Sequence, residues 1–531
     1  MNQFFRKQNG QWSFSTFNAA YKWMLGTTAD LTLNANNPGF ITYQQGVSDV
    51  NGYIAFKSRL DAGYAQAEYA GLVDRRLLLS LGMRVTRESF DDNPRPNVNL
   101  AGLDRAASQT IVDPRLGFTF DLFGNGRTLL RGGYGQFTSP DPDLTVSNTM
   151  FGNGFGVRNY SVNLSSSNRS AFVTGGILSA SQRIQGGSLT RVDPTAILGS
   201  STFTQGTIIG QVWDPDNKMP QARRASLGIE HDASSWLSGL KLGARVSYAK
   251  FLNLQYFVNI NMWQVNPDGT FGVYNDGYPT TTNKFQTTLG TSGPQPPTAR
   301  PGYAIVRGHR LDFNIPGLNQ SFGNVFLSKN DGEGTYKALM LQASRTSAEG
   351  FGFTASLTFS KAEDNNSNER TTQGSDSNTA NPADPLSLIA PSANDRKFRA
   401  TLATYFPIIW GIRGSTNLAY ATGRPYSAFD TRDLNSDTQT GNDLAVGFNG
   451  RNGYRQPSTK QFDLRLTRPF KVGKSLELEV SIDVFNVFNW ANQTTTLQSA
   501  QNASGPITDF GFINTPDRNT REVQFAIRAR F

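Results

Sequence analysis

The sequence predicts an all-β fold, and specifically a transmembrane antiparallel β-barrel with long loops at one end. Three observations predict it: apolar and polar residues alternate along many segments, short and long connections alternate, and the composition favours strands and turns. Alternation with a period of two indicates a strand whose two faces meet different surroundings. In a transmembrane barrel those surroundings are lipid on the outside and a polar lumen on the inside.

The composition of the 531-residue chain favours strands and turns over helices. Hydrophobic residues make up 37% and charged residues 17%, whereas glycine (52 residues) and aromatic residues (11%) are abundant. This mixture is poor in helix formers and rich in strand and turn formers. No segment approaches the run of about 18 apolar residues that a membrane helix needs, so the sequence excludes a helical membrane protein.

The alternating segments predict about fourteen strands, each close to the length at which a tilted strand crosses a bilayer. At the carboxyl end, for example, Val523, Phe525 and Ile527 alternate with polar neighbours, and Leu476–Val484 shows the same pattern. The predicted strands lie near 11–17, 60–70, 77–85, 116–122, 127–137, 222–231, 240–248, 336–345, 351–359, 398–406, 413–422, 462–466, 476–484 and 523–531.

The connections between these strands alternate between short and long. The short ones contain the Gly, Asn, Asp and Pro that tight turns demand, and the long ones are rich in Asn, Ser, Gly and Thr. The two longest, 138–221 and 251–335, have room for a further hairpin, for instance around Tyr256–Trp263. A soluble sandwich would have turns of mixed length, so the alternation favours a barrel with its turns at one end. The predicted tight turns are 71–76, 123–126, 346–350, 407–412 and 469–474.

The apolar face of each strand is expected to meet lipid, and the polar face the lumen. The sheet must close, because open edges leave backbone groups unpaired in hydrocarbon. Aromatic residues at strand ends are expected to form girdles at the membrane interfaces, the alternative being ordinary core aromatics. The charged residues expected in the lumen are Arg84, Arg245, Arg399, Asp463, Glu479 and Arg528, and the girdle residues are Phe406, Trp410, Tyr420, Tyr426, Phe488 and Trp490.

Little in the sequence supports catalysis. There are no cysteines and two histidines, His231 and His309, each best interpreted as an ordinary surface residue. Phosphate-binding loops and a nucleophile elbow are both missing. We therefore predict no enzymatic activity, no cofactor and no metal site. The net charge of +9 is spread along the chain rather than clustered, which argues against nucleic-acid binding.

One segment partly matches a calcium loop. Asp433–Asp437 places oxygen ligands at positions 1, 3 and 5, but Thr438 replaces the required glycine and Leu444 stands where the closing glutamate belongs. The segment is therefore not an EF-hand. Calcium binding by residues 433–443 and a solvated turn both remain open.

Several motifs, in order along the chain, resemble a known family. Asp483–Asn489 looks like the penultimate strand of TonB-dependent receptors, and Tyr420–Tyr426 resembles a strand-to-loop element of the same barrels. Phe353–Asp364 and Leu130–Phe137 narrow the resemblance to Oar-like TonB-dependent transporter barrels. Two further matches are Leu79–Arg84, and Gly450–Tyr454 followed by Phe462–Leu466.

The last strand resembles the signal that outer-membrane barrels present to the barrel assembly machinery. Its residues are the terminal Phe531 together with Ile527 and Phe525 on the alternating apolar strand. This resemblance implies that Phe531 lies at the periplasmic end of the barrel. The loops 138–221, 251–335, 362–396, 423–458 and 489–520 are then expected to face the outside.

By resemblance, the chain is the carboxyl-terminal part of an outer-membrane barrel of about 22 strands. Residues 1–531 are expected to be barrel throughout, without a plug domain, and Met1–Phe14 lacks the apolar core of a signal peptide. The implied function is TonB-dependent uptake of a large, scarce nutrient bound by the outer loops. The implied partners are outer-membrane lipid, the barrel assembly machinery, TonB acting through a plug outside this chain, and an unknown extracellular substrate. Two alternatives remain: a structural or adhesive outer-membrane barrel, and a secreted soluble β protein that binds carbohydrate.

Overall fold

The structure is a computed structural model. It describes residues 5–7, 39–46, 57–91, 106, 108–141, 145–146, 149, 157–164, 203–205, 208–259, 262–265, 271–273, 306–308, 322–347, 350–365, 389–432, 444–445, 447–472, 476–516 and 520–531.

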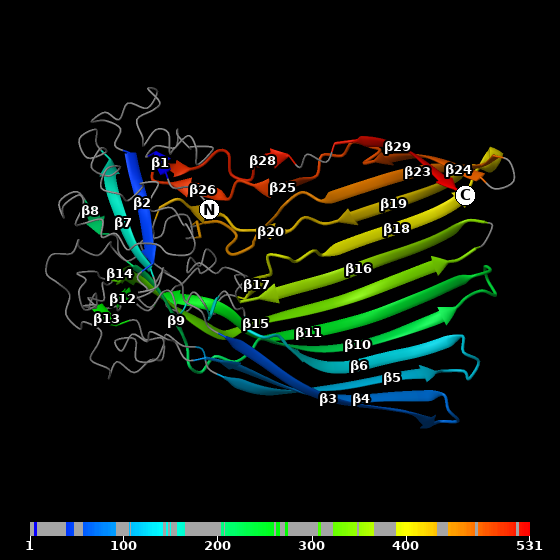
Figure 1. Ribbon diagram of the computed structural model, residues 1–531, viewed down its shortest axis with the longest axis horizontal. Coiled ribbons are helices and arrows are strands. Elements are labelled where there is room, and N and C mark those ends of the chain that lie inside the picture. The colour runs from blue at the N-terminus through cyan, green and yellow to red at the C-terminus, as the bar shows by residue number, and fades with distance from the viewer. Residues whose placement is uncertain are drawn as a thin grey trace.

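One fifteen-stranded sheet dominates the described part of the chain (Figure 1). Its main path joins thirteen strands that pair antiparallel with their neighbours in sequence, while β9 (Ile208–Trp213) and β17 (Ala390–Pro391) attach to its margin. The path runs through β3 (Ser58–Leu72), β4 (Leu77–Phe90), β5 (Gln109–Asp121), β6 (Thr128–Thr138), β10 (Gln221–Asp232), β11 (Leu240–Asn259), β15 (Phe322–Arg345), β16 (Gly352–Asp364), β18 (Phe398–Pro407), β19 (Arg413–Ala421), β23 (Thr459–Val472), β24 (Leu476–Phe485) and β29 (Glu522–Arg530).

Thirteen of the predicted strands correspond to this path, which confirms the all-β antiparallel fold class. The strand predicted near 11–17 lies outside the described residues. Smaller sheets accompany the main one. One contains β1 (Phe5–Lys7), β2 (Gly39–Gly46), β7 (Val157–Leu164) and β8 (Phe203–Gln205), and another contains β12 (Met262–Val265), β13 (Phe271–Val273) and β14 (Val306–Gly308). Further small sheets pair β20 (Pro425–Tyr426) with β22 (Tyr454–Arg455), join β21 (Phe429–Asp430), β26 (Ser499–Asn502) and β27 (Gly505–Pro506), and pair β25 (Gln493–Thr496) with β28 (Ile513–Pro516).

The connections alternate as the sequence predicts. Short turns lie at one end of the sheet and long connections lie at the other, on the right and left of Figure 1. In the turn after β5, the carboxylate of Asp121 accepts hydrogen bonds from the backbone N–H groups of Gly124 and Gly126, both at positive φ. The short connections are 73–76, 122–127, 233–239, 346–351, 408–412 and 473–475, and the long ones are 91–108, 139–220, 260–321, 365–397, 422–458 and 486–521.

One predicted turn is wrong. Residues 469–471 belong to β23, where Pro469 pairs with Glu479 and the ladder continues to Val472 opposite Leu476. The prediction took Pro469 as a turn residue, but proline also fits a strand position at which no ladder N–H is needed.

Several strands are longer than predicted, and β11 and β15 exceed their predicted ranges most. The β11–β15 ladder passes an irregularity between Phe251 and Tyr256 and continues to Asn259 opposite Phe326. Tyr256 and Phe257 are both buried although they are consecutive. The extension is therefore covered on both faces, so its sequence does not alternate, and the parallel strand β9 pairs beside it along β15. The hairpin predicted around Tyr256–Trp263 is replaced by this extension and by β12, which pairs with β13 and β14.

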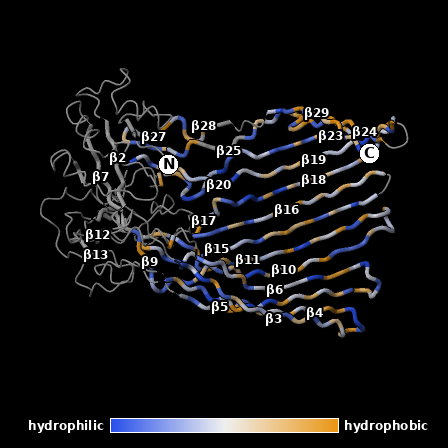
Figure 2. The backbone as a smooth tube through the Cα atoms, viewed as in Figure 1, coloured by the Kyte–Doolittle hydropathy of each residue, from blue (hydrophilic) through white to orange (hydrophobic). Residues whose placement is uncertain are grey.

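The register gives the sheet one apolar face. A single row of paired residues crosses eight strands and is apolar apart from one glycine. It runs through Leu79, Phe118, Gly132, Leu227, Val246, Leu339, Phe359 and Phe398. Figure 2 shows the corresponding alternation of hydrophobic and hydrophilic residues along the strands.

The opposite face is polar. Arg245 shares a row with Arg399 through Met340 and Thr358, and Arg84 pairs with Asp113. The remaining predicted lumen residues, Asp463, Glu479 and Arg528, also belong to the polar rows.

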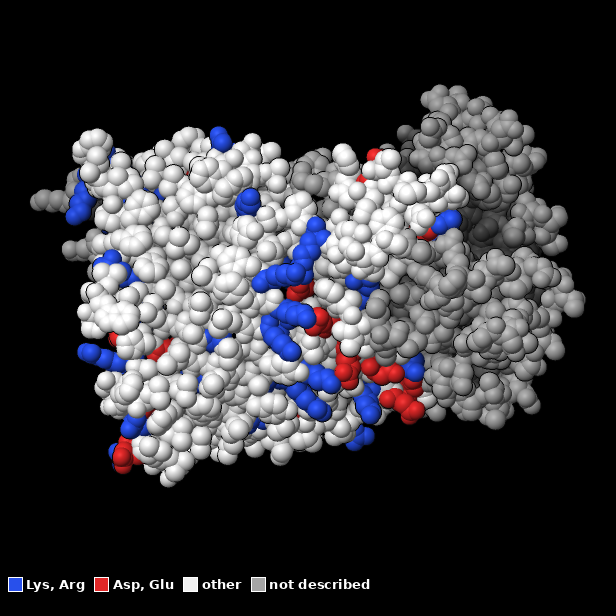
Figure 3. Space-filling view, turned by 180° about the vertical axis from the view of Figure 1, so that it is seen from behind, with Lys and Arg blue, Asp and Glu red and all other residues white. Residues whose placement is uncertain are grey.

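The charged side chains are unevenly distributed along the strands. In Figure 3 they gather in a band at the loop end of the strands, and a broad zone nearer the turns carries few. An uncharged zone between charged margins is the distribution that a wall in contact with lipid requires.

The two edges of the main sheet are β3 and β29. They lie at opposite margins of the sheet in Figure 1, and no ladder joins them among the described residues. The described strands therefore form a curved wall, and each edge leaves backbone donors and acceptors available to a further strand.

The predicted aromatic girdle is confirmed in part. Trp410 lies in the short 3-10 turn η3 (Ile409–Gly411) at the turn end and is 77% exposed. At the loop end, Phe488 stacks between Phe462 and Trp490 at ring-centroid distances of 5.2 and 4.8 Å. For Tyr426 the prediction is wrong, because its side chain is buried among the outer loops.

Candidate functional site

The polar face carries a groove of about 740 Å³ that lies across β4, β5, β6, β10 and β11. Small residues form its floor. Ser80, Gly117, Gly133, Ser226 and Ser247 follow one another in register across these five strands. The polar-face residues around this floor include Gln66, Gly82, Arg115, Gly135, Phe137, Arg224, Arg245, Ala249 and Tyr336.

The floor depends on glycine for close packing. A Cβ atom on Gly133 would lie 2.9 Å from the carbonyl oxygen of Leu116. On the other face, a Cβ on Gly132 would lie 2.4 Å from the ring of Phe118. Glycine therefore leaves the polar face hollow and lets an aromatic ring cover the apolar face of the same strand. Gly133 belongs to the segment Leu130–Phe137, which the sequence analysis used as a family motif.

Arginines border the floor on both sides. On one side the guanidinium groups of Arg115 and Arg224 lie 4.7 and 5.5 Å from the ring centroid of Phe137, a cation–π arrangement. On the other side Arg131 and Arg245 share Glu230, at 3.3 and 4.0 Å. No described carboxylate lies within ion-pair distance of Arg115 or Arg224, so the groove carries a net positive charge.

The polar face is charged differently at the other end of the sheet. There, arginines pair with acids on the neighbouring strand: Arg465 with Asp483 at 3.4 Å, and Arg528 with Glu479 at 4.0 Å. Each pair balances its own charge. Around the groove, by contrast, the arginines that lack a described carboxylate partner are Arg115 on β5 and Arg224 on β10.

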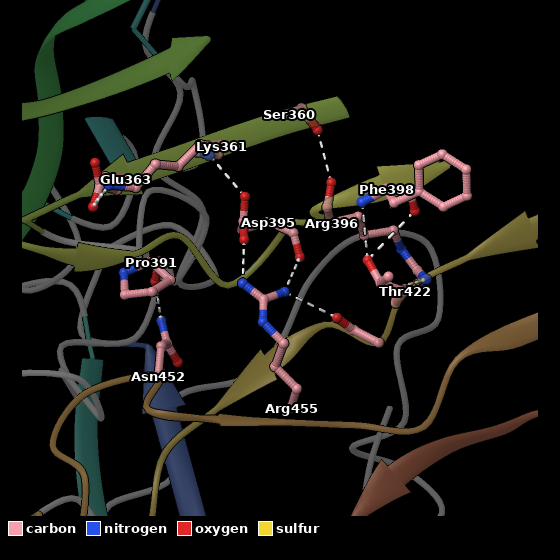
Figure 4. Close-up of polar contacts among 12 residues, drawn as sticks. Ser360, Lys361, Glu363, Pro391, Asp395, Arg396, Phe398, Thr422, Asn452 and Arg455 are labelled. Carbon is pink, nitrogen blue, oxygen red and sulfur yellow. Dashed lines mark hydrogen bonds and ion pairs between the residues drawn. The ribbon is translucent and has the colours of Figure 1, made fainter. Parts of the chain in front are cut away.

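The loop end of the wall is held by a polar network around Arg455 (Figure 4). Its guanidinium group donates to the carboxylate of Asp395 and, at 3.1 Å, to the carbonyl oxygen of Gly423. Asp395 in turn accepts the backbone N–H of Ala362 at 2.7 Å. Asn452 donates to the carbonyl oxygen of Pro391 at 2.8 Å. Two long connections, 365–397 and 422–458, are thereby fastened to β16.

An aromatic cluster joins two of the long connections. Tyr426, Phe448, Tyr454 and Phe510 stack with ring-centroid distances between 5.0 and 6.5 Å. Phe448, Tyr454 and Phe510 pack against a small core of Ala428, Ala445 and Ala500. Burial and the nearby Tyr454 raise the pKa of the Tyr426 phenol. The sequence analysis missed the cluster, because its members are scattered through loops without periodicity.

The residues of the predicted assembly signal lie on the edge strand β29. Phe525 and Ile527 pair with Ile482 and Val480 on the apolar face, and they are 73% and 74% exposed. Phe531 follows the strand and is 99% exposed. The structure thus places all three at an unpaired edge.

The described residues hold little that suggests catalysis. The ring Nδ1 of His231 lies 2.9 Å from the hydroxyl of Thr128, beside a turn, while His309 and the segment 433–437 lie outside the described residues. Among the described residues, no three His, Cys, Asp or Glu side chains group as a metal site would require. None of the described helices is long and apolar enough to span a membrane.

A family model decides the assignment. Residues 1–414 match the model of the outer membrane beta barrel domain. The chain belongs to this family. It is accordingly a β-barrel protein of the cell outer membrane, which confirms the predicted location. Its family is defined by a membrane barrel rather than by an enzymatic activity.

Solved structures of outer-membrane transporters resemble this barrel domain, at low identity. The transporter YddB from Escherichia coli is 10% identical, with a TM-score of 0.43, and the match covers 93% of this chain and 54% of that one. The FrpB iron transporter from Neisseria meningitidis (F3-3 variant) is 10% identical, with a TM-score of 0.41 and coverages of 97% and 48%. The ferric-catecholate import receptor Fiu from K12 E. coli is 11% identical, with a TM-score of 0.42 and coverages of 93% and 51%. The chain thus spans about half the length of these structures. No curated protein matches it.

Proposed function

We propose that the chain forms the distal barrel wall of an outer-membrane transporter of the TonB-dependent, Oar-like kind, which takes up a large, scarce nutrient. The observation that carries the proposal is the groove on the polar face. A floor of small residues bordered by Arg115 and Arg224, which have no described ion-pair partner, leaves space and charge for a passing solute. A sheet that served only as structure would fill this face with side chains.

The long connections supply the capture surface in this proposal. They all leave the same end of the wall, and the connections 365–397, 422–458 and 486–521 are fixed at their bases by the Arg455 network and the aromatic cluster. Fixed bases keep the described parts of these connections at one end of the wall. A ligand bound by these connections would lie at the end of the wall from which a solute would enter the groove.

The partners follow from the same proposal. TonB would act through a plug, which we assign to another part of the protein, with residues 1–531 as barrel wall. The apolar face would meet outer-membrane lipid. Phe525, Ile527 and Phe531 would present an edge strand to the barrel assembly machinery, and pairing in trans through an unpaired edge is the chemistry that such a strand offers.

Depletion of the growth medium tests the transport function. The bacterium that carries the gene, a deletion strain and a strain without TonB are grown under nutrient limitation, and the compounds left in the medium are measured by mass spectrometry. Transport predicts that the same compound remains in the medium of both mutants. A compound taken up without TonB would contradict active transport. Unchanged depletion together with a loss of surface attachment would establish the adhesive alternative.

A further inference from the structure

A buried cluster of oxygen atoms lies at the loop end of the sheet, away from the groove. Glu88 comes from the end of β4, Asp141 follows β6, and Asn330 lies in the extension of β15. The backbone N–H of Asp141 donates to Glu88 Oε2 at 3.2 Å. The side-chain Nδ2 of Asn330 lies 3.2 Å from Asp141 Oδ1 and 3.1 Å from the carbonyl oxygen of Lys218.

The three side chains are almost completely shielded from solvent. Glu88, Asp141 and Asn330 are 3%, 4% and 6% exposed. Among the described residues, Asp141 Oδ2 and Asn330 Oδ1 have no hydrogen-bond partner. A buried polar atom without a partner costs about 1–3 kcal/mol. The unpartnered Oδ2 of Asp141 in particular indicates that a group which binds oxygen belongs there.

The charge of the cluster points to a cation. Two carboxylates lie close together in a buried position, and burial together with the nearby Glu88 raises the pKa of Asp141 to about 7. The hydrogen bond from the Asn330 side chain lowers the pKa of Asp141, but this amide is neutral and supplies no positive charge. A divalent cation beside Asp141 would offset the negative charge that burial disfavours there.

We propose that a calcium ion binds here, held by the carboxylates of Glu88 and Asp141, the amide oxygen of Asn330 and the main-chain oxygen of Lys218. Calcium takes six to eight oxygen ligands, both charged and neutral, in flexible geometry. The four protein groups leave positions for water. A half-turn of the Asn330 amide exchanges Nδ2 and Oδ1, and so directs its oxygen to the place where the other oxygens converge.

The surroundings hold the main-chain ligand in position. Gln109 accepts the backbone N–H of Met219 at 2.7 Å, and Asn253 donates to the carbonyl oxygen of Met219 at 2.9 Å. Lys218 is therefore fixed between β5 and β11. The ion would join β4, the end of β6, β15 and the segment that leads into β10. This site fastens the two ends of the connection 139–220 to the sheet whatever the barrel transports.

Calcium titration of the chelator-stripped protein in detergent tests the site. We expect one equivalent of Ca²⁺ to bind per chain through this cluster, and a calcium-dependent rise in the unfolding temperature. Glu88→Gln and Asp141→Asn should each weaken binding at least tenfold. The exposed acid Asp74 supplies the matched control, Asp74→Asn, which should bind as the wild type does.

A further measurement on Asp141→Asn and one more variant distinguish calcium binding at this cluster from simple damage to the fold and from binding in the loop 433–443. Without calcium, Asp141→Asn should unfold at a higher temperature than the stripped wild type, because it removes one of two crowded charges, whereas simple damage would lower that temperature. The double variant Asp433→Asn, Asp437→Asn should keep the bound ion. Calcium binding that survives Asp141→Asn, or that is lost only in the double variant, would overturn the proposal, as would stripped wild-type protein that binds no calcium at millimolar concentration.

Discussion

Arg451 and Asp364 form a buried ion pair at the base of the outer loops. The Nη1 of Arg451 donates to Asp364 Oδ1 at 2.9 Å, and the two side chains are 1% and 9% exposed. Asp364 ends β16 and Arg451 lies in the connection 422–458, so the pair joins a loop to the wall. A buried charge that loses its partner is strongly destabilising.

Breaking this pair should loosen the loop base. We expect Arg451→Met to cost about 3–5 kcal/mol locally, because the carboxylate of Asp364 stays buried without its cation. Limited proteolysis of the detergent-solubilised protein should then cut the connection 422–458 faster. Glu363→Gln is the control, because it removes an exposed pair with Lys361 that is worth about 0–1 kcal/mol. Equal cleavage rates in the two variants would contradict the assigned role.

The aromatic cluster should depend on Phe510. Its ring contacts Tyr426, Phe448 and Tyr454, so Phe510→Ala removes three of the stacking contacts at once. Truncation of a packed phenylalanine costs about 3–5 kcal/mol. Hydrogen exchange should become faster in residues 426–430 and 499–506. The exposed Phe512 gives the control, and Phe512→Ala should leave the exchange unchanged.

The groove should favour anions. Arg115 and Arg224 have no described carboxylate partner, so the double variant Arg115→Ala, Arg224→Ala should lower anion over cation permeability in planar bilayers several-fold. Arg528→Ala, on the charge-balanced part of the face, should change the selectivity less. The charge assignment fails if both variants conduct with the selectivity of the wild type.

The two ends of the wall should lie on opposite sides of the membrane. Ser504 lies in the loop hairpin β26–β27 and Ser235 lies in a tight turn, and the natural chain has no cysteine to interfere. In intact cells, an impermeant thiol reagent should label Ser504→Cys and spare Ser235→Cys. Permeabilised cells should show labelling of both. Labelling of Ser235→Cys alone in intact cells would reverse the orientation.

The last residue should matter for assembly rather than for stability. Deletion of Phe531 should reduce the heat-modifiable, membrane-inserted form severalfold, because the exposed end of β29 would offer a weaker partner to the assembly machinery. Protein that does insert should unfold at the temperature of the wild type, since Phe531 is 99% exposed and packs against little. Normal insertion of the truncated protein would contradict the assignment of Phe531 to the assembly signal.

The wall could be predicted from the sequence because its two faces meet different surroundings. Leu476–Val484 and Val523–Ile527 alternate, and they pair as β24 and β29 with their apolar residues in register. The double-covered extension of β11 could not be predicted, because Tyr256 and Phe257 are buried on opposite faces and carry no alternation. The turn predicted at 469–474 was wrong because Pro469, a residue type that usually marks a turn, is accommodated within β23 near the sheet margin.

The candidate site was less accessible to sequence reasoning. Arg84, Arg245 and Arg399 were assigned to the polar face from parity alone, and the register confirms this. The groove itself needs the register, since Gly117 and Gly133 become neighbours only when β5 pairs with β6. The cluster of Glu88, Asp141 and Asn330 joins residues far apart in the chain, and no local pattern announces it.

The central claim is that the sheet is a membrane wall with one lipid face and one lumen face. Single cysteines placed at four successive positions of β15 test it most directly: Leu339→Cys, Met340→Cys, Leu341→Cys and Gln342→Cys, in the protein reconstituted into vesicles. A fluorophore on residues 339 and 341 should be quenched by lipid-borne nitroxide, and one on residues 340 and 342 by a water-soluble quencher, because alternate residues point to opposite faces. Uniform quenching of all four by the water-soluble agent would contradict the account.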